Sequence, residues 1–328
     1  MKFAVYGMWD EEYAMLEKLS KEYGFDYVAT SESICLKNVE MSKGCDGVSA
    51  LGKVKVDREL LGALKEQGIC YFSTRTVGYN HIDLQAAKEL GIKVSNSGYP
   101  PDSVAEFTMM LIMLLLRKYK QTLWRQQVND YSLGGLRGET LKGKTVGVFG
   151  GGRIGGRVME LLKGFGCRIL CCDEYRRKEV EEIAEYVDAD TMYALSDIIT
   201  YHVPALKSTV KMVNRETLAK MKDGVILVNT ARGELFDLPT LVEGIESKKI
   251  GGLAMDVFEG EDGIYHENRV VDILRNRDMA YLRQFPNVIL TPHMAFYTQM
   301  SMDSMVQISM QSLMDFHQTG ASKNEIKE

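Results

Sequence analysis

The chain has 328 residues, of which 45% are hydrophobic and 26% are charged, as is ordinary for a globular protein. This composition excludes a disordered chain, a collagen-like repeat and a small disulfide scaffold, and the length indicates roughly two domains. Forty basic and forty-five acidic residues leave a formal charge of −5. So mild a balance argues against a dedicated nucleic-acid-binding protein, which needs concentrated Lys and Arg.

Membrane and metal partners are also not expected. The most apolar stretch, 107–116, is far shorter than the ~20 residues of a membrane span. The N-terminus reaches acidic residues before an apolar signal-peptide region. The six cysteines form no CxxC pair, and the five histidines form no cluster. We therefore expect buried structural thiols, no metal site and a reducing cytoplasm.

Short β-rich runs alternate with helical stretches in the first hundred residues. Strands are expected at 2–7, 45–51, 70–74 and 93–96, and helices at 11–23, 57–66 and 84–90. This alternation predicts βαβ units and a parallel sheet. One long helix is then expected from Asp102 to about Arg125.

The strand–helix alternation restarts after this helix. Further strands are expected at 144–149, 168–172, 198–203, 224–228, 252–257 and 288–290, with a helix at 154–165. The last helix, 298–317, carries Met302, Met305 and Met310 on one face, which predicts core packing and a return to the first sheet. The predicted fold class is α/β, with two doubly wound parallel-sheet domains.

The strongest local signal is the segment 150–155 (GGGRIG), which fits G-x-G-x-x-G. The pattern alone is weak, but a predicted strand precedes it, a helix follows it, and a second strand ends at Asp173. Gly150 permits a tight turn, Gly152 lets the backbone approach a pyrophosphate, and Gly155 permits close packing of helix on strand. The start of that helix favours phosphate. The segment therefore predicts a dinucleotide site, against the alternative of a glycine-rich turn without a ligand.

The choice between the two nicotinamide cofactors is expected to depend on Asp173. Its carboxylate accepts hydrogen bonds from ribose hydroxyls and repels a 2′-phosphate, which favours NAD over NADP. Arg176 and Arg177 follow closely and weaken that preference.

Three downstream segments follow predicted strands, at the edge where open α/β sheets bind ligands. They are 228–233 (VNTARG), 254–261 (AMDVFEGE) and 291–296 (TPHMAF). Their arginine, acidic residues and histidine suit reduction of a 2-oxo acid. The arginine binds the carboxylate, the histidine supplies a proton, and a neighbouring carboxylate favours the protonated histidine. Taken singly, each has a plainer interpretation as a structural or solvated residue.

At this point the chain resembles the D-isomer-specific 2-hydroxyacid dehydrogenases, over essentially its whole length. The resemblance rests on ordered motifs, namely 75–83 (RTVGYNHID), 99–106 (YPPDSVAE), the glycine segment, 202–204 (HVP) and the three downstream segments. The long stretch between Glu261 and His293 is similar to the D-lactate dehydrogenase branch, which includes enzymes of vancomycin-resistance operons.

The resemblance implies a role for each matching residue. Arg232 resembles the substrate-binding arginine, Glu261 the partner of the histidine, and His293 the acid/base, so that His81, His202, His266 and His317 are not expected to transfer the proton. The implied substrate-binding residues are Val77, Gly78, Tyr99, Leu51 and Phe296. The implied cofactor-binding residues are Gly150, Gly152, Arg153, Ile154, Gly155, Asp173, His202, Val203, Pro204, Thr209, Thr230, Ala231, Arg232 and Asp256.

The resemblance also implies a Rossmann NAD domain at 101–297, inserted in a flavodoxin-like catalytic domain formed by 1–100 and 298–328. Relatives of this kind are commonly homodimers. The leading hypothesis is an NAD-dependent enzyme that interconverts a 2-oxo acid and the (R)-2-hydroxy acid, with pyruvate and D-lactate as the expected pair. The alternatives are a dehydrogenase for larger substrates, of the 2-hydroxyisocaproate, phenyllactate or 2-hydroxyglutarate type, and a non-catalytic NAD-sensing binding protein.

Overall fold

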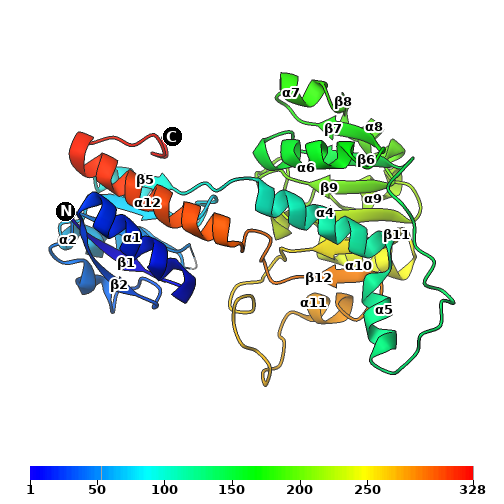
Figure 1. Cartoon of the computed structure of the whole chain (residues 1–328), viewed down its shortest axis with the longest axis horizontal. Helices are drawn as coiled ribbons and strands as arrows, with labels where there is room; N and C mark the ends of the chain where they lie inside the picture. The colour runs from blue at the N-terminus through cyan, green and yellow to red at the C-terminus, as the bar shows by residue number, and fades with distance from the viewer. Residues whose placement is uncertain (53, 328) are drawn as a thin grey trace. The chain divides into compact units, whose positions relative to one another are not determined.

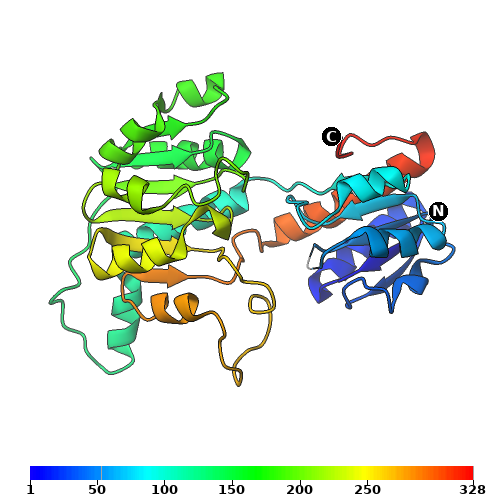
Figure 2. The ribbon, with the colours of Figure 1, turned by 180° about the vertical axis from the view of Figure 1, so that it is seen from behind.

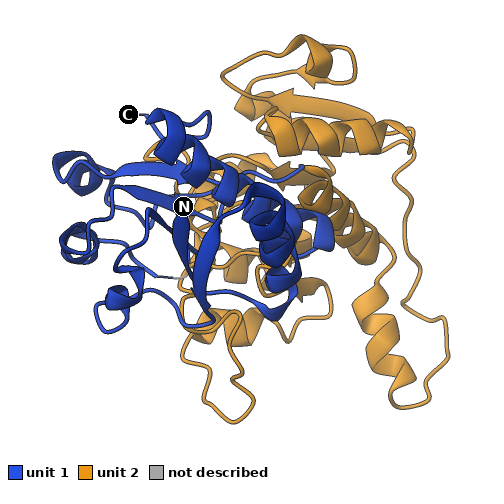
Figure 3. Ribbon diagram, turned by 60° about the vertical axis from the view of Figure 1, so that its left-hand side comes forward, with its two compact units in different colours: residues 1–100, 297–328 blue, residues 101–296 orange. Residues whose placement is uncertain are grey.

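The computed structural model describes residues 1–52 and 54–327, which divide into two compact units (Figure 3). Unit 1 comprises Met1–Pro100 and Tyr297–Glu328, and unit 2 comprises Pro101–Phe296. Each unit is built on its own parallel sheet. The predicted fold class, two parallel-sheet α/β domains, is confirmed.

The sheet of unit 1 runs in the order β2-β1-β3-β4-β5, with every neighbouring pair parallel. Its strands are β1 (Lys2–Tyr6), β2 (Asp26–Thr30), β3 (Gly47–Ala50), β4 (Tyr71–Thr74) and β5 (Lys93–Asn96). The strand order reverses between β1 and β3, where such sheets bind ligands. Alternate residues of β1 point to opposite faces of the sheet. Phe3 and Val5 pack in one hydrophobic core, and Ala4 and Tyr6 pack in the other.

Helices cover both faces of this sheet (Figures 1 and 2). One face carries α1 (Tyr13–Tyr23), preceded by the short η1 (Asp10–Glu12), together with α12 (Gln299–Thr319). The other carries α2 (Arg58–Glu66), α3 (Leu84–Glu89) and the short η2 (Val39–Ser42). Met302, Met305 and Met310 are buried, and α12 packs on β3 and β4. The methionine face of the last helix is therefore core, as predicted.

The sheet of unit 2 runs in the order β12-β11-β10-β9-β6-β7-β8 and is also parallel. Its strands are β6 (Thr145–Phe149), β7 (Arg168–Cys172), β8 (Glu185–Tyr186), β9 (Ile198–Tyr201), β10 (Val225–Asn229), β11 (Ile250–Met255) and β12 (Val288–Leu290). The order reverses between β6 and β9. The segments that follow these two strands therefore flank the position where a dinucleotide binds in this architecture.

Two helical layers enclose the sheet of unit 2 (Figures 1 and 2). One contains α4 (Asp102–Leu116), α6 (Arg153–Lys163) and α7 (Lys178–Glu181). The other contains α8 (Ala189–Leu195), α9 (Arg215–Lys220), α10 (Leu238–Glu246) and α11 (Arg277–Leu282).

The single long helix predicted from Asp102 to Arg125 is wrong. The structure has α4 and then a separate α5 (Tyr119–Gln126), with Lys118 between them at φ +51°. The returning chain interrupts the helix, because the N–H of Glu139 donates to the carbonyl of Leu116 at 2.9 Å. A Cβ on Gly138 would lie 2.6 Å from that same carbonyl oxygen. A contact with Glu139, well outside the helix in sequence, therefore outweighs the local preference for continued helix.

Other expectations also need correction. Strands β2 and β8 were not predicted, and both lie at an edge of their sheet. The thiols were predicted to be buried, but Cys35 is exposed and Cys70, Cys167 and Cys172 are only half-buried. In the part of the chain that the structure describes, no helix is long and apolar enough to cross a membrane.

Candidate active site

The glycine loop joins β6 to α6 at the strand-order reversal of unit 2. Gly150 has φ +92°, and a Cβ there would lie 2.6 Å from the carbonyl oxygen of His202. A Cβ on Gly155 would lie 1.8 Å from the carbonyl oxygen of Gly150, so no larger residue permits this packing of helix on loop. At Gly152, by contrast, a Cβ would meet nothing within 4 Å among the described residues. The loop is therefore closely packed at Gly150 and Gly155 but leaves free space at Gly152, at the N-terminus of α6. This arrangement fits a bound pyrophosphate.

Asp173 follows β7, and its carboxylate reaches back to the glycine loop. Oδ2 accepts a hydrogen bond from the N–H of Gly151 at 2.5 Å, and Oδ1 accepts one from Tyr175 at 2.8 Å. Arg177 donates from Nη1 to the carbonyl of Gly151 at 3.3 Å. The expected ribose position therefore has a carboxylate with an arginine beside it.

His202 follows β9 on the other side of the glycine loop. Its N–H donates to the carbonyl of Phe149 at 2.8 Å, and its Nε2 lies 3.0 Å from Oγ1 of Thr200. Although the residue is only half-buried, loss of hydration around the ring lowers its pKa to about 3. His202 is therefore neutral at physiological pH and is unsuited to supply a proton.

Arg232 lies in the loop that follows β10, and hydrogen bonds within the loop hold it. The buried side chain of Asn229 accepts a hydrogen bond from the N–H of Ala231 at 3.0 Å and donates to the carbonyl of Arg232 at 2.8 Å. Nη1 of Arg232 donates to the carbonyl of Ala231 at 2.6 Å. A Cβ on Gly233 would lie 2.3 Å from the backbone nitrogen of Glu259. The arginine loop thus packs directly on the segment that follows β11.

Asp256, at the start of that segment, holds the loop that carries His293. Its Oδ1 accepts hydrogen bonds from Oγ1 of Thr291 at 2.6 Å and from the N–H of Met294 at 2.9 Å. Its Oδ2 accepts one from the N–H of Ala295 at 2.8 Å. Burial raises the pKa of Asp256, while these donors oppose the rise. The sequence motif gave no sign of this use, and the predicted contact of Asp256 with the cofactor stays a prediction.

His293 and Glu261 form a close pair within unit 2. Nδ1 of His293 lies 2.5 Å from Oε1 of Glu261, and the other carboxylate oxygen accepts a hydrogen bond from the N–H of Phe258 at 2.6 Å. The side chains of His293 and Glu261 are 35% and 22% exposed, so the pair is partly open to solvent. Because Nδ1 is engaged by the carboxylate, Nε2 is the ring nitrogen that can exchange a proton with a substrate.

His266 also lies against His293, a contact that the sequence did not reveal. Its Nε2 is 3.1 Å from the carbonyl oxygen of His293. Its position five residues after Glu261 is the one sequence feature that places it near the pair.

The predicted substrate-binding residues Val77 and Gly78 lie in unit 1, in the loop after β4. Asn96 donates from Nδ2 to the carbonyl of Val77 at 2.7 Å, and Oγ1 of Thr76 donates to the carbonyl of Gly78 at 2.7 Å. These bonds fix the orientation of both peptide groups. Val77 is 39% exposed, so the loop presents itself to solvent rather than to the core.

Leu51 directly follows β3, at the strand-order reversal of unit 1. It is 7% exposed, and a Cβ on Gly7 would lie 3.2 Å from its own Cβ. At the next position a Cβ on Gly52 would lie 2.8 Å from the ring of His81. Tyr99 is half-buried near the end of the first part of the unit. Unit 1 therefore holds Leu51, Val77, Gly78 and Tyr99, and unit 2 holds the other predicted site residues, including Phe296.

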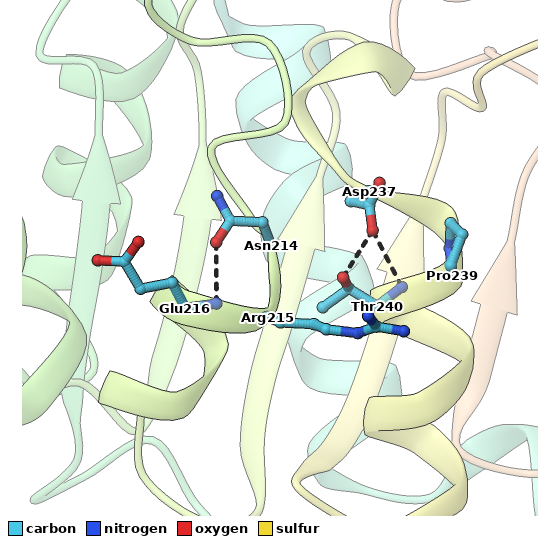
Figure 4. Close-up of a pocket in the computed structure, with 6 residues that line it drawn as sticks. All are labelled: Asn214, Arg215, Glu216, Asp237, Pro239 and Thr240. Atoms are coloured by element: carbon cyan, nitrogen blue, oxygen red, sulfur yellow. Dashed lines mark hydrogen bonds between the residues drawn. The ribbon is translucent and has the colours of Figure 1, made fainter.

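Two surface hollows are distinct from the His293–Glu261 pair. One, of about 480 Å³, lies between the N-termini of α9 and α10 (Figure 4). Its Asn214 and Asp237 already cap those helices with their own side chains. The other, of about 230 Å³, borders the start of α6 and is lined in part by Arg153, Arg157 and Arg177.

Comparison with known proteins agrees with this geometry. The family described as D-isomer specific 2-hydroxyacid dehydrogenase, NAD binding domain, matches residues 109–295. The chain belongs to the D-isomer-specific 2-hydroxyacid dehydrogenase family. An aromatic 2-oxoacid reductase of Clostridium sporogenes is 40% identical over 99% of both chains. A D-lactate dehydrogenase of Escherichia coli is 34% identical over 99% of this chain and 100% of that one. The solved structure of a D-2-hydroxyisocaproate dehydrogenase covers 100% of both chains with a TM-score of 0.92 at 31% identity.

These findings confirm the predicted family and cofactor. The enzyme is an NAD-dependent D-2-hydroxyacid dehydrogenase, and the open glycine loop at the start of α6 fits NAD. The relatives have names that cover lactate, hydroxyisocaproate and aromatic substrates. The family therefore establishes the type of reaction, whereas the relatives differ in the 2-oxo acid for which they are named.

Removing the charge of Asp173 is expected to relax the preference for NADH over NADPH. A carboxylate near a doubly charged 2′-phosphate opposes binding by more than about 1.4 kcal/mol, so Asp173→Ala should lower the ratio of kcat/KM for NADH to that for NADPH at least about tenfold. Asp173→Asn is the matched control, because its amide oxygen can still accept from Gly151. Both variants should show the same relaxed ratio, and an unchanged ratio in Asp173→Asn would reject charge repulsion as the cause.

Proposed function

We propose that this dehydrogenase reduces pyruvate and larger 2-oxo acids to (R)-2-hydroxy acids, with Arg232, Glu261 and His293 as its catalytic residues. The observation that carries the proposal is the His293–Glu261 pair, whose Nδ1–Oε1 distance is 2.5 Å. His293 lies on a loop held by Asp256, in the same unit as the Arg232 loop. We infer further that unit 2 is the NAD domain and unit 1 the catalytic domain.

The residues divide the chemistry between them. NAD, when bound, supplies or takes up the hydride. Arg232 binds the carboxylate of the 2-oxo acid and polarises its carbonyl, with the guanidinium direction fixed by the bond to Ala231. His293 gives a proton from Nε2 to the carbonyl oxygen, and Glu261 stabilises the protonated ring. In the reverse direction His293 accepts the hydroxyl proton.

A direct assay separates this function from that of an NAD-sensing binding protein. NADH oxidation is followed with pyruvate, 2-oxobutyrate, 2-oxoisocaproate and phenylpyruvate. We expect turnover of pyruvate and of at least one larger acid. NADH binding without turnover of any of them would instead support the binding protein.

Leu51, the residue that follows β3, is the basis for proposing that the enzyme accepts a range of 2-oxo acids. The family resemblance aligns Leu51 with a position where lactate-type relatives often carry an aromatic residue. A smaller side chain leaves more room for the substituent of the 2-oxo acid. The 40% identity to an aromatic 2-oxoacid reductase supports the same view.

Leu51→Tyr is expected to narrow the range of substrates toward pyruvate. In the natural enzyme we expect 2-oxobutyrate or a bulkier acid within about tenfold of pyruvate in kcat/KM, since a methylene changes discrimination by ~1–3 kcal/mol. Tyrosine should raise the pyruvate-to-phenylpyruvate ratio about tenfold or more. Leu51→Met, which adds no ring, is the control and should leave the ratio unchanged. A preference of the natural enzyme for pyruvate above about a hundredfold over all three larger acids would contradict an open pocket.

A cytoplasmic homodimer remains part of the proposal. Apolar side chains are exposed along α5 and the segment after it, namely Leu123, Trp124, Val128, Tyr131 and Leu133. Exposed apolar side chains gathered on one segment are typical of a surface covered by another protein. This supports self-association through that segment.

A further inference from the structure

His266 is held beside the His293–Glu261 pair by a sharp turn. After Glu261 the chain folds back, because the N–H groups of Ile264 and Tyr265 both donate to the Glu261 carbonyl, at 2.9 and 3.0 Å. Gly263 and His266 have φ +69° and +61°, which reverse the direction of the chain. The position of His266 is therefore set by the catalytic carboxylate's own segment.

Tyr265 anchors this turn in the core of unit 2. Its ring packs against the hydrophobic cluster on the α10 face of the sheet. Its hydroxyl is buried without a hydrogen-bond partner among residues 1–52 and 54–327, and burial raises its pKa. The turn is therefore attached to the core of unit 2 one residue before His266.

The contact with His293 is a directed hydrogen bond. Nε2 of His266 lies 3.1 Å from the carbonyl oxygen of His293. A carbonyl oxygen can only accept, so Nε2 carries the hydrogen and donates it. The His266 ring also lies 6.2 Å from the His293 ring and 6.4 Å from the Phe296 ring, between centroids.

His293 needs such support because its backbone is strained. Its φ of +51° lies in the left-handed region, which residues other than glycine rarely adopt. Its N–H donates to the carbonyls of Asp256 and Thr291 at 2.7 and 3.0 Å, and its Nδ1 meets Glu261. The bond from His266 adds a restraint on the carbonyl side, which restricts rotation of that peptide group and hence of the imidazole.

We propose that His266 is a positioning residue, which keeps His293 aimed for proton transfer by donating a hydrogen bond to its carbonyl. The inference rests on the proposed role of His293. It assigns no proton transfer to His266 itself. Its loss should therefore slow proton transfer to every 2-oxo acid alike, without weakening NADH binding.

Two substitutions separate the hydrogen bond from the ring. His266→Phe keeps a ring against Phe296 and His293 but has no donor. His266→Gln loses the ring but keeps an N–H at a similar reach. For each purified full-length variant, kcat, KM for pyruvate, KM for NADH and the melting temperature are measured, with His293→Ala assayed alongside.

We expect His266→Phe to lower kcat by more than about twofold and up to tenfold, with KM for NADH unchanged, since misplacing a catalytic group slows the reaction more than it weakens binding. His266→Gln should keep kcat within about twofold of the natural enzyme. A His266→Phe enzyme with normal kcat, or an equal loss in both variants, would overturn the inference. Full turnover by His293→Ala would instead overturn the proposed function, and so the two failures are distinguishable.

Discussion

Replacing His293 with alanine is expected to lower kcat by about 10²–10⁴-fold, the usual contribution of general acid–base catalysis. The loss follows from geometry, because Nδ1 of His293 lies 2.5 Å from Glu261, which leaves Nε2 as the ring nitrogen that can give up a proton. NADH affinity should stay nearly unchanged, because the glycine loop and Asp173 lie after different strands of the sheet, β6 and β7. Single-turnover NADH oxidation and NADH titration by fluorescence measure the two quantities separately.

A histidine outside the site provides the control for this experiment. His317 lies in the last turn of α12 in unit 1, with Nδ1 3.5 Å from Asp46. His317→Asn should leave kcat and NADH affinity unaltered. If His293→Ala turned over at a near-normal rate, the proton donor would have to be sought elsewhere. His81 would then come before His202, whose pKa of about 3 leaves its ring neutral.

The parts of the site that the sequence revealed are those fixed by local stereochemistry. Gly150 and Gly155 stand where a Cβ would collide with backbone, so the chain must use glycine there. A glycine pattern between a strand and a helix is therefore readable from sequence alone. The positions of Arg232 and His293 after parallel strands are similarly local, because such strands end at one edge of the sheet.

The parts that the sequence did not reveal depend on contacts between distant residues. The break between α4 and α5 follows from the bond of Glu139 to Leu116, which no helical periodicity encodes. The use of Asp256 as the support of the His293 loop depends on a separation of about forty residues. His266 reaches His293 through a turn built on positive φ at a non-glycine residue, for which composition gives no signal.

The ion pair of Arg75 and Glu12 was likewise missed, and breaking it is expected to have the largest effect on stability. Both side chains are fully buried in unit 1. Nε of Arg75 donates to Oε1 of Glu12 at 2.9 Å, and its terminal nitrogens donate to Ser49 and to the carbonyls of Tyr6 and Gly7, each at 3.0 Å. The guanidinium thus ties β4, which leads into the predicted substrate loop, to β1 and β3.

Arg75→Met should lower the free energy of unfolding of unit 1 by about 3–5 kcal/mol, because it leaves the Glu12 carboxylate buried without its counter-charge. Arg75→Met combined with Glu12→Gln should cost less than Arg75→Met alone, since no buried charge then remains unpaired. The exposed pair of Arg58 and Glu89 supplies the control, and Arg58→Met should cost no more than about 1 kcal/mol.

The two tryptophans allow the unfolding of unit 1 to be followed by itself. Trp9 lies in unit 1, where its backbone N–H donates to Oε2 of Glu12 at 2.9 Å, and Trp124 lies in unit 2. In a Trp124→Phe background, denaturant titration of the remaining fluorescence reports on the unit that contains the ion pair.

Because Arg75 directly precedes the loop of Val77 and Gly78, Arg75→Met should also raise KM for the 2-oxo acid while NADH affinity stays unchanged. A loss of stability no larger than that of Arg58→Met would show that the buried pair does not stabilise unit 1, and an unchanged KM would show that it does not hold this loop.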